Sequence, residues 1–229
     1  MKFKSAIFSE ASGSIAGMTF SHNKGGMYVR TRATPINPAS PAQQAVRDSV
    51  KVLTQNWLNV LTDAERESWE TYAANVPVLN KLGASIKLTG MQMYLRNSAE
   101  MLRSGTAPVT QAPAIFNLGT LTTPAVASVI VGPPSTMSLT FSVTDDWKTH
   151  GTPANARLFL YASRPQDPTI NFFKGPYRTA GALDGSVASP QTIPLPFDVQ
   201  AGQRIFFRAR ALTDDGRLSA EVTFRYDVP

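Results

Sequence analysis

The sequence has 229 residues, of which 42% are hydrophobic and 17% are charged, and its formal net charge is +6. These values predict a folded protein of about one or two domains. The absence of cysteine excludes disulfides, thiolate nucleophiles and cysteine metal ligands. No apolar run approaches the roughly 18 residues of a membrane-spanning helix and no signal peptide is recognisable, so we expect synthesis in a cytoplasm and no membrane partner.

Positive charge is concentrated at the start of the sequence. Residues 1–47 contain six basic residues and one acid, which places a net charge of +5 there. We predict that residues 1–41 form an extended arm with a basic β-hairpin, followed by a strap that prolines stiffen. Because such a segment has little apolar core of its own, we expect another surface to order it. The residues predicted to contact that partner are Lys24, Tyr28, Arg30, Arg32, Pro35 and Pro38.

Residues 42–105 are predicted to form a small helical module. Capping-box patterns mark the starts of three helices: Ser40 with Gln43, Thr62 with Glu65, and Thr89 with Gln92. Apolar side chains then recur at steps of three and four, as in helices that bury one face. The predicted core of this module consists of Val50, Leu53, Trp57, Trp69, Tyr72 and Tyr94. Residues 78–88 alternate irregularly, which is consistent with either a loop or a short hairpin.

The remainder of the chain predicts a second architecture. Residues 106–124 are rich in Pro, Ala and Thr and are expected to be a linker. Beyond them, strand-like segments occur at 125–131, 138–143, 156–162, 205–212 and 219–226, and residues 213–217 form a turn sequence. Five to seven short strands in 125–229 predict an antiparallel β-sandwich similar to fibronectin type III or immunoglobulin-like modules. The predicted fold class is therefore α+β, multidomain.

Residues suited to catalysis are sparse. His22 and His150 have no suggestive partner in the sequence, and both are expected to be loop residues. Gly13 and Gly17 lack the Gly-Lys-Ser/Thr that would complete a phosphate-binding loop. We predict neither an enzyme nor a bound cofactor or metal. Calcium binding stays open as an alternative if loops bring together the acidic residues Asp145, Asp146, Asp167, Asp184, Asp214 and Asp215.

Two interpretations fit the basic strand around Tyr28. It could contact phosphates of a nucleic acid, with the tyrosine ring available for stacking. Alternatively, Met27, Val29 and Thr31 pack inward while Tyr28 and the arginines face solvent or an acidic partner, and this second interpretation is favoured. The tryptophans present a similar choice. Helical spacing assigns Trp57 and Trp69 to a core, whereas Trp147 is expected in a loop and stays ambiguous between packing and binding.

A series of short motifs spans residues 12–105. The motifs are residues 13–17, 25–30, 35–38, Gln43 or Gln44 with Arg47, Trp57, 61–66 with Trp69, 72–73, and 88–90 with Tyr94 and Asn97. This series resembles a family of uncharacterised proteins encoded by tailed bacteriophages and prophages. The resemblance implies a structural protein of the virion, and it carries no catalytic residue.

Together, the arm and this resemblance predict a capsid decoration or cement protein that forms homo-oligomers and contacts a major capsid, connector or tail protein. A head–tail connector or a tail or baseplate component is the alternative within the same class. From other classes, a nucleic-acid-binding protein would use the basic hairpin, and a carbohydrate-binding module or cryptic hydrolase would need an acidic or aromatic cleft in the sandwich.

Overall fold

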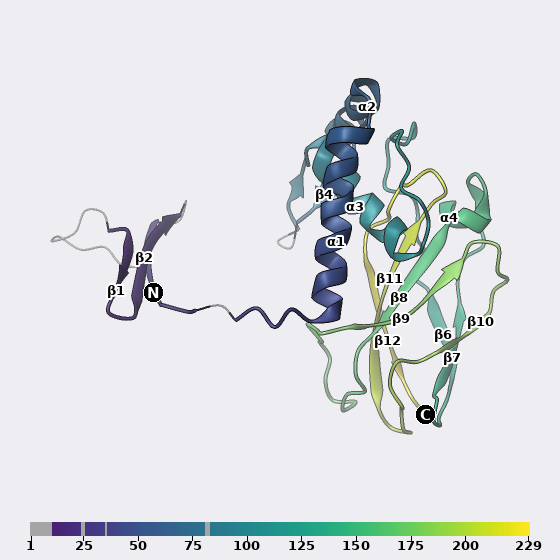
Figure 1. The fold of residues 1–229 in the computed structure, drawn as a ribbon. Coiled ribbons are helices and arrows are strands. Elements are labelled where there is room, and N and C mark those ends of the chain that lie inside the picture. Colours follow the sequence, from purple (N-terminus) through teal and green to yellow (C-terminus); the bar gives the residue numbers. More distant parts are fainter. Residues whose placement is uncertain (1–10, 24–25, 35, 81–82) are drawn as a thin grey trace. The chain divides into compact units, whose positions relative to one another are not determined.

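A computed structural model describes residues 11–23, 26–34, 36–80 and 83–229. The chain is a mixed α and β protein with antiparallel sheets, which confirms the predicted α+β class (Figure 1). It divides into two compact units, residues 1–44 and residues 45–229. The first unit contains the predicted arm and the first four residues of the first helix, and the second contains the rest of the helices and the remaining sheets.

The arm contains a three-stranded antiparallel sheet in the order β1-β2-β3. Its strands are β1 (Gly13–Ile15), β2 (Met18–Asn23) and β3 (Gly26–Thr31). The predicted hairpin corresponds to β2 and β3, and β1 adds a strand that the sequence did not predict. Ala16 and Gly17 connect β1 to β2 with φ values of 45° and 82°. Positive φ at both central residues is the geometry of a two-residue hairpin turn, so glycine at position 17 serves the turn.

Three helices follow, with the boundaries that the capping patterns predict. They are α1 (Pro41–Gln55), α2 (Asp63–Asn75) and α3 (Gly90–Arg103), and a π-helical turn, η1 (Asn56–Val60), extends α1. Thr62 and Thr89 each form a complete capping box, with Glu65 and Gln92 respectively. At Ser40 the two reciprocal bonds with Gln43 are longer, at 3.4 Å each. Satisfied amide groups at these positions fix where each helix begins.

Between α2 and α3 the chain forms a short hairpin from β4 (Val78–Leu79) and β5 (Ser85–Ile86). This settles the choice that the sequence left open for residues 78–88, of which 81 and 82 lie outside the described part. Gly90 then allows α3 to start directly against α2, because a Cβ there would lie 2.6 Å from the backbone nitrogen of Glu70. The Gly90 amide also donates to Glu70 Oε2 at 2.8 Å.

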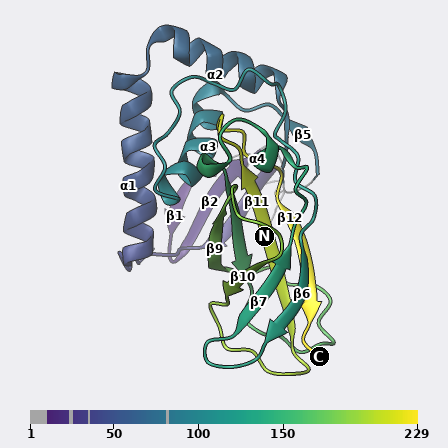
Figure 2. The same ribbon diagram turned by 90° about the vertical axis from the view of Figure 1, so that its right-hand side faces the viewer.

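Two antiparallel sheets form the rest of the second unit. One has the order β10-β7-β6, from β6 (Ala125–Ile130), β7 (Thr136–Thr140) and β10 (Gln191–Pro194). The other has the order β12-β11-β8-β9, from β8 (Arg157–Ala162), β9 (Arg178–Asp184), β11 (Arg204–Leu212) and β12 (Val222–Asp227). Helices α2 and α3 lie at one end of these sheets in both views (Figures 1 and 2). The five predicted strands are present, while β9 and β10 are additional.

The two sheets bury their facing side chains in one core. Alternate residues of β11, such as Phe207 and Ala209, join Leu139 of β7 and Leu160 of β8 there. Trp147, on the short helix α4 (Asp146–Thr149), is fully buried in the same core. The sequence left Trp147 ambiguous, and the structure assigns it to packing. Alternation with period two places the other β11 side chains on the opposite face of the four-stranded sheet.

The predicted linker, residues 106–124, is packed against the helices. Trp69 Nε1 donates to the Thr110 carbonyl oxygen at 2.8 Å, and Tyr72 Oη donates to the Asn117 carbonyl oxygen at 2.6 Å. The chain then reaches the sheets, where the Thr122 amide and hydroxyl groups donate to Asp145. These bonds hold residues 106–124 in place within the second unit, rather than leaving them as a spacer between independent bodies.

Candidate functional site

The strand register divides the arm sheet into two faces of different chemistry. Directly opposed residues lie on the same face, and Ile15 opposes Met18 while Phe20 opposes Val29. These side chains form an apolar face. On the other face, Tyr28 opposes Ser21, and Thr19 lies between Ser14 and Arg30 on the neighbouring strands. The predicted alternation along β3 is therefore confirmed: Met27 and Val29 share one face, and Tyr28 and Arg30 share the other.

The arm nevertheless lacks an interior. Between residues 11 and 40, no side chain whose exposure is described is buried. Ile15 and Met18 on the apolar face are 71% and 46% exposed. The expectation that Thr31 packs inward is wrong, since its side chain is exposed, and Tyr28 is half-buried rather than fully solvated. A single layer of three short strands has no second layer to cover its apolar face, which explains the exposure.

The predicted contact residues of the arm are largely accessible. Arg30, Arg32 and Pro38 are exposed. Lys24 and Pro35 lie outside the described residues. Within the described part of the chain, neither Arg30 nor Arg32 has a carboxylate within ion-pair distance. The Arg32 amide donates to the Gly17 carbonyl oxygen at 2.7 Å, which fixes the backbone there while the guanidinium remains available.

The strap between β3 and α1 has no helix or strand among its described residues, 32–34 and 36–40. Ile36 is 89% exposed, the largest exposure among the large hydrophobic side chains described. Ala39 has a φ of 46°, and its amide donates to Asn37 Oδ1 at 3.3 Å. A local side-chain bond of this kind can shape an extended segment without any core beneath it.

The apolar stripe of α1 changes character along the helix. Leu53 is fully buried and Trp57, in η1, is 8% exposed. By contrast, Val50 is 46% exposed and Val46 is 65% exposed. The prediction that Val50 belongs to the core of the helical module is therefore wrong. The period of the stripe is correct, but only its C-terminal end meets other elements of the second unit.

The other predicted core residues of the helical module are confirmed. Trp69 lies at the centre, with the Tyr72 ring 5.9 Å away at 84° and the Tyr94 ring 5.5 Å away at 75°. The Trp57 ring is 5.6 Å from Tyr94. Edge-to-face contacts of this kind stabilise aromatic cores beyond the burial of area. Burial raises the pKa of Tyr72 to about 12, because its hydroxyl cannot ionise in an apolar setting without losing hydration.

Arg217 is the main structural residue that the sequence analysis missed. Its side chain is 1% exposed and forms ion pairs with Asp146 and Asp215, both at 2.9 Å. Its Nη1 also donates to Asn117 Oδ1 at 2.6 Å. Arg217 therefore joins residues 106–124 to the turn between β11 and β12. The sequence contained only a weak signal for this role, namely an arginine directly after an Asp-Asp-Gly turn.

The acidic residues considered for calcium are distributed among separate contacts. Asp145 accepts from Thr122, Asp214 accepts from Thr152 and Asn155, and Asp184 pairs with Arg157. Among the described residues, no three acidic or histidine side chains form a group that could hold a metal ion. Asp167 accepts both the amide and the hydroxyl of Thr169, two residues further on, as aspartates in turns commonly do.

The two histidines are in different local structures. His22 was expected in a turn, but it lies in strand β2 with an exposed side chain. His150 directly follows α4, and its Nε2 is 3.7 Å from Asp215 Oδ2. Asp215 is already paired with Arg217, so this carboxylate belongs to a structural cluster.

Comparison with known proteins gives no match: no family model, no curated protein and no solved structure resembles this chain. In the part of the chain that the structure describes, no helix has both the length and the apolar character needed to cross a bilayer.

Proposed function

We propose that this protein is a structural component of a tailed-bacteriophage virion, most specifically a capsid decoration or cement protein. The supporting observation is the arm: a separate unit whose described side chains are all at least partly exposed, with Ile15 and Met18 on one face and Arg30 on the other. An arm of this kind gains its second layer when it lies on another polypeptide. The motif series in residues 12–105 supplies the virion context.

The chemistry of the arm suits attachment to an acidic protein surface. Arg30 and Arg32 would pair with carboxylates of a coat or connector protein, and charge-assisted bonds of this type add orientation as well as affinity. In a closed ring or lattice, each subunit donates and receives the same contact, so modest interfaces add up to a stable assembly. A head–tail connector or a tail or baseplate component would use the arm in the same way.

We further propose that the two-sheet part of residues 125–229 is an immunoglobulin-like or fibronectin type III-like module. The shared core between a three-stranded and a four-stranded antiparallel sheet supports this assignment. Such a module would project from the particle or bridge to a neighbouring subunit. No part of this proposal requires catalysis.

The proposal is tested by deleting residues 1–38 in the encoding phage or prophage and quantifying the protein in purified particles. We expect the truncated protein to keep the melting temperature of its second unit and to be lost from particles. Reversing two exposed charges outside the arm, Lys174→Glu with Arg178→Glu, is the control and should leave incorporation intact. Normal incorporation of the truncated protein would overturn the proposal.

The nucleic-acid alternative makes a different prediction for the same arm. It requires DNA binding that weakens steeply with salt and disappears in an Arg30→Glu, Arg32→Glu variant. Under the virion proposal, the full-length protein has no such binding, and this double variant is instead defective in particle incorporation.

A further inference from the structure

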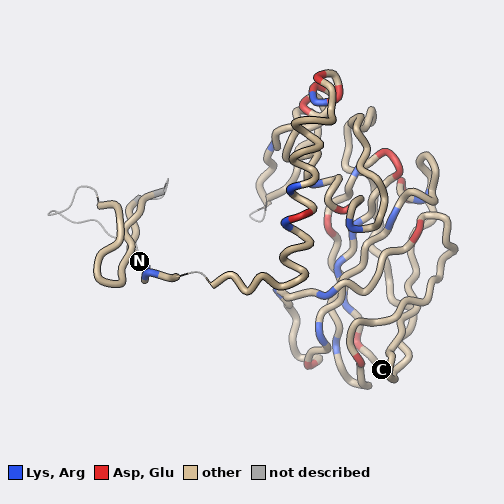
Figure 3. Tube along the Cα trace, viewed as in Figure 1, with Lys and Arg blue, Asp and Glu red and all other residues tan. Residues whose placement is uncertain are grey.

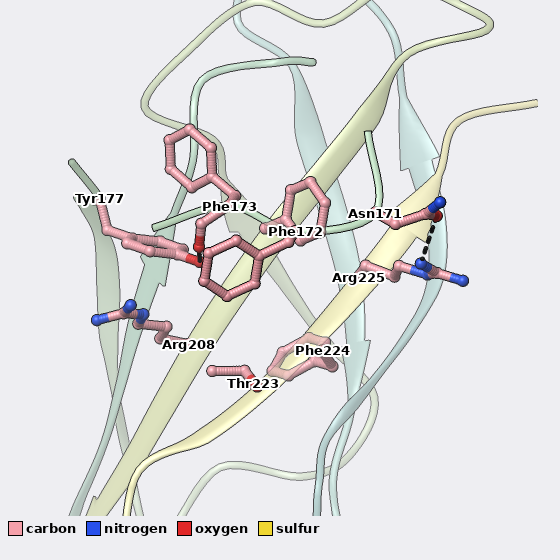
Figure 4. A pocket seen from close by; sticks show the side chains of 9 residues that line it. Asn171, Phe172, Phe173, Tyr177, Arg208, Thr223, Phe224 and Arg225 are labelled. Carbon is pink, nitrogen blue, oxygen red and sulfur yellow. Dashed lines mark hydrogen bonds between the residues drawn. The ribbon is translucent and has the colours of Figure 1, made fainter. Parts of the chain in front are cut away.

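An aromatic pocket lies on the outer face of the four-stranded sheet, away from the shared core. It has a volume of about 270 Å³. Strands β11 and β12 form its floor, and the segment before β9 forms its wall (Figure 4). The lining residues are Asn171, Phe172, Phe173, Tyr177, Phe206, Arg208, Thr223, Phe224 and Arg225. Five of these nine residues are aromatic, two are arginines and none is acidic. The Phe224 ring stacks on Phe207 in the shared core, so the aromatic side chains on the pocket face are Phe172, Phe173, Tyr177 and Phe206.

The wall of the pocket is held rigidly from beneath. The Phe173 ring stacks on Phe206 at 5.9 Å and 17°, and it meets the Tyr177 ring edge-on at 5.2 Å. Tyr177 Oη donates to the Phe173 carbonyl oxygen at 3.1 Å. The buried Arg204 donates to the Ile170 carbonyl oxygen at 2.8 Å. A wall fixed in this way does not have to be ordered when a ligand binds, which favours affinity.

On this rigid wall, Phe172 is 79% exposed. A single exposed apolar side chain is common on protein surfaces, but Phe172 lies beside Phe173 and Tyr177 and so extends a continuous aromatic surface, which is typical of a binding site. The flat face of the Phe172 phenyl ring is an apolar surface large enough to contact one ring of a ligand. A ligand that covers this surface would remove the phenyl ring from water and gain the corresponding hydrophobic free energy.

The polar groups of the pocket are mainly hydrogen-bond donors. Asn171 Oδ1 accepts from Arg204 at 2.9 Å and from Arg225 at 3.2 Å, which leaves the Asn171 amide NH₂ as a donor. Arg225 is exposed and adds a cation at this end. At the other end, the Arg208 guanidinium lies 4.1 Å from the Tyr177 ring centroid. The lining contains two guanidinium groups and no carboxylate, which matches a ligand that presents an anion, because charge-assisted hydrogen bonds are the strong ones.

The groove next to the pocket has no excess of positive charge, since Arg208 and Arg210 are balanced there by two glutamates. Beyond Tyr177 and Arg208, the adjoining groove is lined by Glu100 and Glu221. Glu221 is 3.3 Å from Arg208 and 3.5 Å from Arg210, so one carboxylate is shared by two arginines there. A nucleic-acid strand that continued along this groove would bring its phosphates against these carboxylates. The pocket therefore favours a single anionic ring over a polyanionic chain.

We propose that this pocket binds a carboxylated sugar ring of a glycan, with one face of the ring on Phe172 and its carboxylate on Arg225. The open shape of the pocket allows a residue within or at the end of a longer glycan to enter. Asn171 and Thr223 would donate to ring oxygens. This inference does not rest on the arm, because every residue in it belongs to the second unit.

The test is a titration of the full-length protein with methyl glucuronide, with methyl glucoside as the neutral probe of the same ring, followed by NMR and calorimetry. We expect saturable binding of the glucuronide and at least about tenfold weaker binding of the glucoside, a difference of 1.4 kcal/mol. Phe172→Ala and Arg225→Gln should each weaken glucuronide binding by about tenfold. Both side chains are exposed, so the melting temperature should not change.

Matched control variants separate the pocket from general surface effects. Phe116→Ala removes a phenyl ring elsewhere in the second unit that is 53% exposed, and Arg30→Gln removes the same charge from the arm. Neither should change glucuronide binding. Absence of saturable binding, equal affinity for the glucoside, or unaltered binding in both pocket variants would overturn the inference. Preferential binding of a single-stranded oligodeoxynucleotide in the same pocket would overturn it in favour of nucleic acid.

Discussion

The arm sheet and the four-stranded sheet are both antiparallel and both carry an apolar face, yet only one of them has a core. In the four-stranded sheet, Phe207 and Leu160 are fully buried because a second sheet covers them. In the arm sheet, Ile15 remains 71% exposed. Strand pairing thus places the apolar side chains on one face of a sheet, but these side chains become buried only when a second layer packs on that face. In the second unit, the layer that covers the apolar face is another sheet of the same chain. For the arm, we propose that a partner protein supplies this covering layer.

Charge follows the same division between the two regions. In the described part of the arm, Arg30 and Arg32 are the only residues among Lys, Arg, Asp and Glu. Neither of them is paired with a carboxylate of the described residues. In the second unit, basic and acidic side chains are interspersed, and acidic residues gather at the start of α2 (Figure 3). Arg157, Arg204 and Arg217 each pair with an aspartate. These three arginines thus support the fold of the second unit, while the two arginines of the arm remain available.

The largest expected effect comes from removing the aromatic centre of the second unit. Trp69→Ala should lower the free energy of unfolding by about 3–5 kcal/mol, because it deletes a fully buried ring and its hydrogen bond to Thr110. Urea denaturation followed by circular dichroism measures this change. Tyr28→Ala, in the arm, is the matched aromatic control and should change the free energy by less than about 0.5 kcal/mol. Equal effects of the two variants would contradict the distinction between the regions.

A smaller effect is expected at Tyr72. Tyr72→Phe removes the bond from Oη to the Asn117 carbonyl oxygen and should cost about 1 kcal/mol at neutral pH. The pKa of Tyr72 is raised from 10 to about 12, so its neutral form stabilises the folded state fully below pH 10. That contribution is lost as the pH rises through 12. Two pKa units correspond to about 2.7 kcal/mol, more than the advantage of about 1 kcal/mol that wild type has at neutral pH. The unfolding free energy of wild type minus that of the variant should therefore fall from pH 10 to 12 and change sign, and a constant difference would contradict this assignment.

Patterns in the sequence were sufficient for two helix starts and one turn, where a local interaction determines the structure. The capping residues at Thr62 and Thr89 correctly predicted where α2 and α3 begin, because the bonds they form lie within one helical turn. The turn at residues 213–217 was predicted for the same reason, and the Thr213 amide donates to the Arg217 carbonyl oxygen at 3.0 Å. Local chemistry of this kind can be read directly from neighbouring residues.

Features that depend on distant contacts were not predictable in this way. The hydrogen bonds that hold residues 106–124 against α2 join residues more than 40 positions apart. No local pattern reveals such contacts, so the proline-rich segment was interpreted as a linker. The burial of Arg217 depends on Asn117, 100 positions away. Strand β9 shows no hydrophobic alternation that would have predicted it. The segment before it is rich in Gly, Pro and aromatic residues, and its side chains line the pocket around Phe172.

The smallest effect is expected at Val50, and it tests the boundary between the covered and uncovered parts of α1. Leu53, one turn later, is fully buried, so Leu53→Ala should cost about 2–5 kcal/mol in unfolding free energy. Val50→Ala should cost less than about 0.5 kcal/mol in the isolated protein, because its side chain is 46% exposed. If assembly covers this end of α1, Val50→Ala will impair incorporation into particles while leaving the melting temperature unchanged. A large loss of stability in the isolated Val50→Ala variant would instead mean that the helix already packs along its whole apolar stripe.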